Sequence, residues 1–224
     1  MTLARATSVI LAKELKTEFR SRELLGTTIV FVLIVIVLFS FTFDPTSSES
    51  RRFGPGLLWL AFLFAASLMF QPSFLREQMN DTLAALRLAP IDPFSILAGK
   101  VAANFLFLLL VEMILLPVFA VMYNTAIMAV LPQLILVLAL GTVAMATTGT
   151  VFSAVSAQAR LRELLLPLLL LPILAPVLIA STEATAGLLR DPAELSRVWV
   201  TFLVAFDVIF LTAAWLVGEY VLEE

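Results

Sequence analysis

Long hydrophobic runs separated by short polar segments make up most of the chain. Several runs approach or exceed 18 apolar residues, the length that a helix needs to cross a bilayer. Their apolar positions are continuous instead of alternating, which excludes a transmembrane β-barrel. The pattern therefore predicts an all-α polytopic membrane protein with six spans, at residues 26–43, 56–74, 101–123, 127–156, 161–182 and 198–218.

The polar segments are too short to fold alone, so we expect all 224 residues to form a single transmembrane domain. An interfacial helix would precede spans one and two, a cytoplasmic segment would follow them, and a short tail would end the chain after spans three to six. The interfacial helix covers residues 1–25, spans one and two cover 26–74, and the cytoplasmic segment covers 75–100. Spans three to six cover 101–218 and the tail covers 219–224.

Proline affects two of the predicted spans. Asp92 followed by Pro93 has the pattern of a helix N-cap with proline at the first helical position, so span three could begin at Pro93. Three prolines in span five each remove a backbone donor, which predicts a kink or a break; they are Pro167, Pro172 and Pro176. The segment 183–197 that follows could hold a short re-entrant hairpin.

Lysine and arginine are unevenly distributed between the two sides of the predicted bundle. With the N-terminus inside, the cytoplasmic segments hold ten of these residues and the outer segments hold four. Cytoplasmic loops of membrane proteins are enriched in both residue types. We therefore expect both termini in the cytoplasm and the lipid bilayer around the six spans.

The longest internal polar interruption, residues 74–100, has the spacing of an amphipathic helix. Apolar residues recur at i, i+4 and i+7 on one face: Met79, Leu83 and Leu86. Much of the remaining surface is polar, with Arg76, Glu77, Asn80, Asp81 and Arg87. One interpretation is a connector that lies on the membrane surface. The other is a docking helix that passes force from a cytoplasmic partner into spans two and three.

The N-terminal segment also has helical spacing, with two separate stripes. The apolar stripe consists of Leu11, Leu15 and Phe19, and the basic stripe consists of Lys13, Lys16 and Arg20. A helix of this kind lies in the membrane interface with its cations near anionic headgroups. The alternative is a solvated cytoplasmic extension.

Composition removes most catalytic chemistry. Without cysteine there are no disulfides or thiolate metal sites, and without histidine there is no histidine base and no common metal or haem ligand. Gly99-Lys100 is followed by Val101, and Phe94 stands where a phosphate-binding loop needs its first glycine. We therefore expect no enzyme activity, no metal site, and no nucleic-acid partner.

Two carboxylates lie near the middle of predicted spans, Glu112 in span three and Asp207 in span six. A charge at that depth costs roughly 2.5–3.5 kcal/mol on insertion scales. One interpretation is that they line a polar cavity or pathway. The other is that each is protonated, or hydrogen-bonded to hydroxyls of span four such as Thr142, Thr147 or Thr148.

Span four contains small residues at a spacing that lets helix backbones approach closely. Gly149 and Ser153 are four residues apart, and Gly141 and Ala144 lie upstream. Packing within the chain is favoured over a dimer seam. Because six spans are few for a transport path, we nevertheless expect a homodimer with twelve.

Five stretches, in their order and spacing, resemble the B subunit of the cytochrome c maturation system, the CcmB-type haem exporter permease. The resemblance covers about residues 12–182 and fades in span six. The stretches are AKELKTEFRSRELL (Ala12–Leu25), GLLWLAFLFAASL (Gly56–Leu68), FLREQMNDTLAALRLAPID (Phe74–Asp92), GKVAANFLFLLLVEMILLPVFA (Gly99–Ala120) and RLRELLLPLLLLPILAPVLIA (Arg160–Ala180).

The resemblance implies an ABC-2 exporter-like fold with a connecting helix, a coupling helix and outer re-entrant helices. It implies a separate cytoplasmic ATPase subunit that binds ATP, a haem-handling membrane subunit, a small accessory subunit and a periplasmic haem chaperone, all at a bacterial inner membrane. The coupling helix would cover about Arg76–Leu88. Its residues expected to face the ATPase are Arg76, Glu77, Asp81, Leu83, Leu86 and Arg87.

Axial haem ligation by this chain could come only from methionine or tyrosine, which are uncommon choices alone. We therefore hypothesise that the chain binds no cofactor directly and transmits ATP-driven motion, while a partner ligates the haem. Three other functions stay open. They are an ABC-2 permease for a drug, lipid or polysaccharide, a membrane assembly subunit that transports nothing, and an ion-coupled transporter that uses Glu112 and Asp207.

Overall fold

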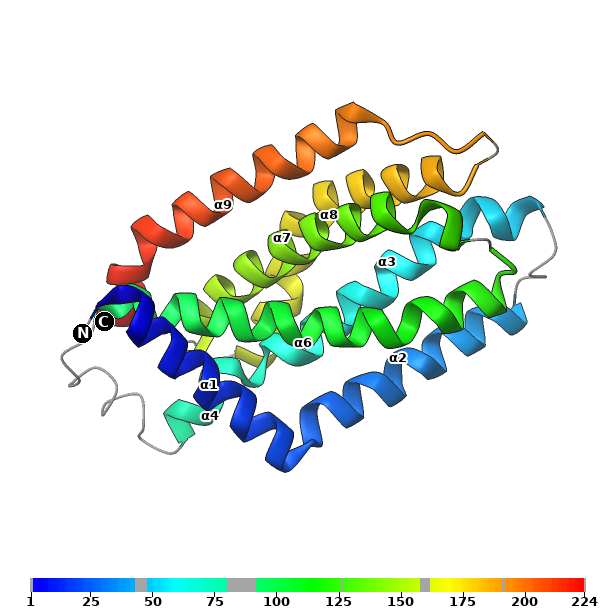
Figure 1. The fold of residues 1–224 in the computed structure, drawn as a ribbon. Coiled ribbons are helices and arrows are strands. Elements are labelled where there is room, and N and C mark those ends of the chain that lie inside the picture. The colour runs from blue at the N-terminus through cyan, green and yellow to red at the C-terminus, as the bar shows by residue number, and fades with distance from the viewer. Residues whose placement is uncertain are drawn as a thin grey trace.

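The computed structural model describes residues 2–42, 48–79, 92–125, 127–157, 162–190 and 192–223, which are almost entirely helical (Figure 1). No strand occurs in these ranges, which confirms the all-α fold class. The helices are α1 (Leu3–Ser21), α2 (Glu23–Thr42), α3 (Ser48–Phe70), α4 (Pro72–Met79), α6 (Pro93–Met122), η1 (Ile127–Val130), α7 (Leu131–Ala157), α8 (Arg162–Leu188) and α9 (Arg197–Glu223).

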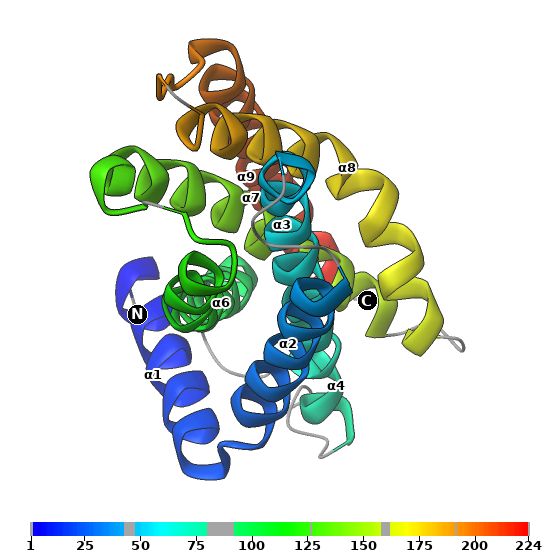
Figure 2. The ribbon, with the colours of Figure 1, turned by 90° about the vertical axis from the view of Figure 1, so that its right-hand side faces the viewer.

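Six helices of the described chain are long and apolar enough to cross a membrane, as the hydrophobic runs predict. They cover Glu23–Thr42, Phe53–Leu75, Pro93–Met122, Ile127–Ser156, Leu168–Leu188 and Arg197–Gly218. The start of α1 and the end of α9 lie at the same end of the bundle, here called the terminal end (Figure 1). Viewed along the bundle, α6 lies among α1, α2, α3 and α7, with which it is in contact (Figure 2).

Helix α6 begins at Pro93, as the cap pattern predicts. The Asp92 carboxylate accepts a hydrogen bond of 2.8 Å from the backbone N–H of Phe94. With 30 residues, α6 is about 45 Å long, whereas the hydrocarbon core of a bilayer is about 30 Å thick. Helix α6 is therefore longer than the hydrocarbon core that it has to cross.

A sharp turn separates α1 from α2 and sets the angle between them (Figure 1). Arg22 adopts the left-handed conformation, with φ of 54°, and its N–H donates to the Glu18 carbonyl. The buried side chain of Glu18 accepts a 2.8 Å hydrogen bond from the N–H of Leu25. Because Glu18 thus caps the start of α2 from α1, the turn is held in one geometry.

Span five is bent but not broken, which agrees with the kink that its prolines predict and excludes the break. Helix α8 continues without a break from Arg162 to Leu188, although it bends along its length (Figure 2). Its apolar part runs from Leu168 to Leu188. The predicted re-entrant hairpin is wrong, because residues 183–188 are the last turns of this helix. Tight packing compensates for the missing proline donors, since Leu170, Leu174 and Val177 are fully buried.

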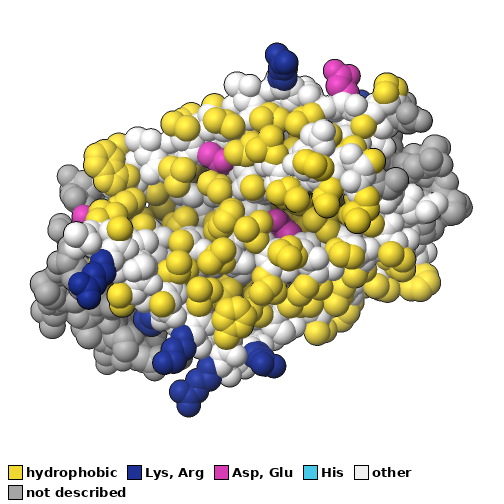
Figure 3. All heavy atoms as spheres, viewed as in Figure 1, with side chains coloured by type: hydrophobic (Ala, Val, Ile, Leu, Met, Phe, Trp, Pro, Cys, Tyr) yellow, Lys and Arg dark blue, Asp and Glu magenta, His cyan; other side chains and the backbone are white. Residues whose placement is uncertain are grey.

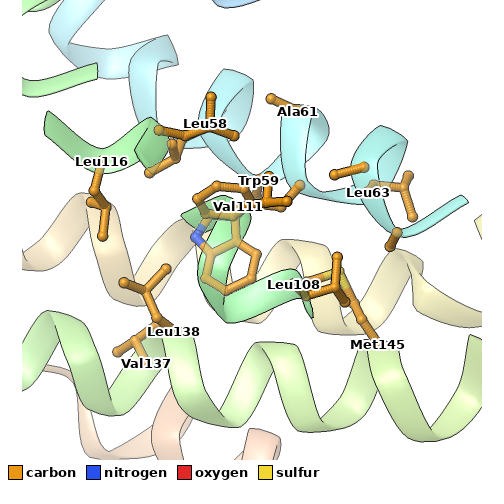
Figure 4. Packing of buried hydrophobic residues seen from close by; sticks show 14 of the residues in the cluster. Leu58, Trp59, Ala61, Leu63, Leu108, Val111, Leu116, Val137, Leu138 and Met145 are labelled. Atoms are coloured by element: carbon orange, nitrogen blue, oxygen red, sulfur yellow. The ribbon is translucent and has the colours of Figure 1, made fainter. Parts of the chain in front are cut away.

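Glycines of α7 allow two large aromatic rings of α3 to lie against its backbone. A Cβ atom at Gly141 would collide with the Trp59 ring, and one at Gly149 would collide with the Phe70 ring. Figure 4 shows the Trp59 indole enclosed by buried aliphatic side chains such as Val111 and Leu138. The Ser153 hydroxyl donates to the Phe70 carbonyl at 2.7 Å. The small residues of span four therefore pack within the chain.

Replacing Gly149 with alanine should destabilise the bundle by about 1–3 kcal/mol, because the fully buried Phe70 ring has no free space to enter. Gly26→Ala is the matched control, since no atom lies within 4 Å of a Cβ built there. Thermal unfolding of the detergent-purified chain measures both. Equal unfolding temperatures for the two variants would show that the Phe70 contact is not tight.

Candidate functional site

A buried lysine anchors three helices together at the terminal end. Lys100 on α6 is 1% exposed. Its ammonium donates to Glu14 Oε1 of α1 at 2.7 Å and to the Ser73 carbonyl of α4 at 2.6 Å. It also lies 4.7 Å from the centre of the Phe74 ring, within the range of a cation–π interaction. Charge-assisted contacts of this kind are the strong ones in a protein interior.

The anchor extends from α4 to α7 through neutral side chains. The Asn104 amide on α6 donates to the Thr150 hydroxyl at 2.9 Å and to the Ser73 hydroxyl at 3.4 Å. Ser73 therefore receives one contact from each of two α6 residues that lie one helical turn apart. We call Glu14, Ser73, Lys100 and Asn104 the terminal anchor.

Helix α4 is the described part of the predicted coupling segment. It follows α3 after a turn at Gln71 and covers Pro72–Met79. The backbone of Arg76 and Glu77 lies in α4, but their side chains, and all of Asp81, Leu83, Leu86 and Arg87, lie outside the described residues. The terminal anchor holds the beginning of this segment, and the contacts expected for its charged residues stay predictions.

Helix α1 presents three faces. Ala6, Ile10 and Glu18 are buried, and Gly99 of α6 lies against Ile10. Leu11 and Leu15 pack against the core from one flank, while Phe19, predicted in the same stripe, is 53% exposed. The apolar stripe is thus only partly packed inside the chain. The basic residues predicted for the other stripe, Lys13, Lys16 and Arg20, are exposed.

Of the two carboxylates inside the spans, Glu112 has a defined partner. The Thr142 hydroxyl lies 2.5 Å from Glu112 Oε1 and 2.7 Å from the Leu138 carbonyl. The Thr142 hydroxyl has one hydrogen, and the Leu138 carbonyl can only accept it. Both contacts are therefore hydrogen bonds when Thr142 donates to Leu138 and the Glu112 carboxyl donates to Thr142. Thr147 and Thr148, the other hydroxyls considered for this role, are buried without a partner in the described chain.

Asp207 on α9 is 6% exposed, and its Oδ1 has no hydrogen-bond partner among the described residues. Glu112 Oε2 is in the same situation. Figure 3 shows acidic side chains within a largely hydrophobic face. No continuous series of ionisable groups joins Glu112 to Asp207 in the described spans, and no group of three potential metal ligands occurs there.

Local sequence patterns carry little signal for the terminal anchor. From the sequence, Lys100 is a cytoplasmic charge and part of an incomplete phosphate-binding motif. Its pairing with Glu14 joins residues 86 positions apart, which no local pattern encodes. The available signal was a lysine in the first turns of a long apolar helix, because a cation at that depth needs a partner.

Lys100→Met should destabilise the chain by about 3 kcal/mol, because it leaves the Glu14 carboxylate and the Ser73 carbonyl without their main donor. A Glu14→Gln/Lys100→Met double variant should regain part of this loss. Lys16→Met is the control, since Lys16 is exposed and should change stability by no more than about 0.5 kcal/mol. Thermal unfolding in detergent measures all three, and wild-type stability of Lys100→Met would exclude the anchor.

Glu14 should also make stability depend on pH. Burial raises the pKa of the Glu14 carboxyl, but Lys100 and Lys13 lower it more, so the pKa lies below its usual 4.5. A carboxyl with a lowered folded-state pKa stabilises the fold above its unfolded-state pKa, and this contribution is lost as pH falls through the folded value. The stability difference between wild type and Glu14→Gln should thus be full near neutral pH and shrink below about pH 4.5. Unfolding scans at several pH values test this, and a constant difference would contradict it.

Comparison with known proteins agrees with the resemblance and extends it. Residues 5–218 match the family model described as CcmB protein. Heme exporter protein B of Pseudomonas aeruginosa is 32% identical over 88% of this chain and 89% of its own length. The protein of the same name from Rhodobacter capsulatus is 32% identical over 83% of this chain and 83% of its own length. The one from Haemophilus influenzae is 32% identical over 80% of this chain and 81% of its own length.

The family match continues to residue 218 at the end of span six, beyond the stretches in which the resemblance is apparent by eye. It includes α1 from Arg5 onward, the terminal anchor and both carboxylates inside the spans. Because the match covers nearly the whole chain, this protein belongs to the CcmB family.

Proposed function

We propose that the chain is the membrane permease subunit of a haem exporter that serves cytochrome c maturation. Three relatives that align with at least four-fifths of the chain are named heme exporter protein B. The six apolar helices supply a membrane-spanning body, and the sequence contains no phosphate-binding loop. ATP hydrolysis would therefore take place on a separate cytoplasmic ATPase subunit.

The terminal anchor carries the proposal that this chain couples ATP hydrolysis to movement of its spans. The segment that begins with α4 connects span two to span three, and Lys100 ties α4 to both α6 and α1. A force applied to residues 76–88 would reach α6 through this buried ion pair and hydrogen bond. The proposed ATPase contacts remain Arg76, Glu77, Asp81, Leu83, Leu86 and Arg87.

The terminal end would face the cytoplasm of a bacterium, across its inner membrane. Helix α1 and its C-cap bring five of the cations to this end, Arg5, Lys13, Lys16, Arg20 and Arg22, whereas Arg190 and Arg197 lie at the opposite end. The proposed complex contains two copies of the chain, the ATPase, a haem-handling membrane subunit and a small accessory subunit. ATP-driven motion would export haem or release a haem-loaded periplasmic chaperone.

Haem ligation is assigned to a partner. The chain has no histidine and no cysteine, and Tyr123, one of its two tyrosines, is buried next to Phe119, with ring centres 4.7 Å apart. The described residues contain no cluster of potential metal ligands. The proposed role of this subunit is therefore to transmit motion to the haem-handling subunit.

A charge swap in the coupling segment tests the ATPase contact. Glu77→Lys/Arg87→Glu keeps the net charge of the segment, and hence its topology signal, but reverses the charges offered to the partner. Purification of the tagged full chain from native membranes, followed by mass spectrometry, should recover about tenfold less ATPase with this variant than with wild type.

Arg190→Glu/Glu194→Lys makes the same type of swap in the exposed connection at the opposite end and should leave ATPase recovery unchanged. Recovery of an ATPase without any haem-handling protein would retain the ABC architecture and reopen the identity of the substrate. Recovery of no ATPase with the wild-type chain would reject the proposal in favour of an assembly subunit or an ion-coupled transporter.

A further inference from the structure

The exposed side of α1 carries a face of cations that points away from the bundle. Arg5, Lys16 and Arg20 are exposed. At 100° per residue they fall within about one-sixth of the helix circumference, on the side opposite the buried Glu18 and the half-buried Glu14. Figure 3 shows lysine and arginine side chains gathered along the lower left of the molecule, where α1 runs in Figure 1. We call Arg5, Lys16 and Arg20 the basic face.

An apolar flank borders the basic face. Leu11, Leu15 and Phe19 recur at i, i+4 and i+8, so they form one row along the helix. The first two are half-buried against the core, and Phe19 is 53% exposed. A large aromatic side chain that is half outside the protein, beside cations and next to a membrane span, has the surroundings that the interfacial region of a bilayer provides.

The turn into α2 fixes the depth of this helix. The first span begins at Glu23, three residues after Arg20. The Glu18–Leu25 hydrogen bond holds the turn, and the Glu14–Lys100 ion pair holds the middle of α1 against α6. The second half of α1 therefore lies at the boundary of the hydrocarbon, where its cations are at the level of the phosphate groups.

We propose that the basic face of α1 is a binding site for the phosphate headgroups of anionic phospholipids. The apolar flank favours a lipid over an acidic protein surface, because Phe19 is placed to enter the acyl region while Lys16 and Arg20 stay with the headgroups. Lys13 is exposed beside this face but is engaged by Glu14 at 3.2 Å, so it contributes less. The site concerns this chain and the bilayer alone and does not depend on the proposed transport function.

Native mass spectrometry of the purified full chain tests the site directly. The probes are palmitoyl-oleoyl phosphatidylglycerol and the phosphatidylcholine with the same acyl chains. Wild type should bind phosphatidylglycerol more tightly, and this preference should fall as salt is added, because exposed charges are screened. Each removed cation should reduce the preference about fivefold. Arg5→Gln/Lys16→Gln/Arg20→Gln should therefore abolish it without unfolding the chain, since all three residues are exposed.

Arg190→Gln/Arg197→Gln removes exposed cations at the opposite end and should keep the preference. Lys16→Arg/Arg20→Lys keeps the charge and should also keep it. Retention of phosphatidylglycerol by the triple variant would overturn the proposal, as would an equal loss with the control pair. A triple variant that keeps its lipid but loses a co-purifying protein would assign the basic face to that partner instead. Failure of the transport proposal would leave all of these results unchanged.

Discussion

The terminal end of this protein depends on the neutralisation of one ammonium group. Lys100 lies about 10 Å along a helix that is otherwise apolar, and its side chain is buried. An unpaired cation there would cost several kcal/mol, so the carboxylate of Glu14 and the carbonyl of Ser73 must both be in place. These two acceptors belong to different helices, and α1 and α4 are therefore positioned by the same charge. A hydrophobic residue at this site could pack as well, but it would not fix which parts of α1 and α4 meet.

Features that depend on neighbouring residues could be predicted from the sequence, whereas contacts between distant residues, such as the neutralisation of Lys100, could not. The spans follow from the length of each apolar run, and the start of α6 follows from Asp92 and Pro93, because both signals are local. The re-entrant hairpin was expected because three prolines weaken a helix locally. Helix α8 nevertheless continues unbroken to Leu188, because burial of Leu170 and Leu174 against neighbouring helices outweighs the missing hydrogen bonds, and residues 183–188 are its last turns instead of a hairpin. The Glu14–Lys100 pair could not be predicted, because its partners are brought together only by the complete bundle.

Polar groups elsewhere in the spans are used differently. Thr142 links Glu112 to the backbone of α7, and the Trp59 indole donates to the Thr185 hydroxyl at 2.9 Å. These contacts connect α6 to α7 and α3 to α8 in the interior of the bundle. Side-chain hydrogen bonds between membrane helices are individually modest, about 0.6 kcal/mol on average. Their role is to select the rotation of each helix, while close packing at Gly141 and Gly149 supplies the contact area.

Helix α1 joins these constraints to the bilayer. One side of it carries Glu14, and the opposite side carries Lys16 and Arg20, so the proposed lipid site would place the helix between the Lys100 ammonium and the headgroup region. The proposed coupling through residues 76–88 needs a part of the chain that does not move with the applied force, or the whole bundle would turn as one body. The proposed binding of α1 to lipid headgroups, through its cations and Phe19, would supply such a part. Displacement of α4 would then act on the Lys100 contacts against a fixed α1, and the strain would pass into α6 and the spans that pack on it.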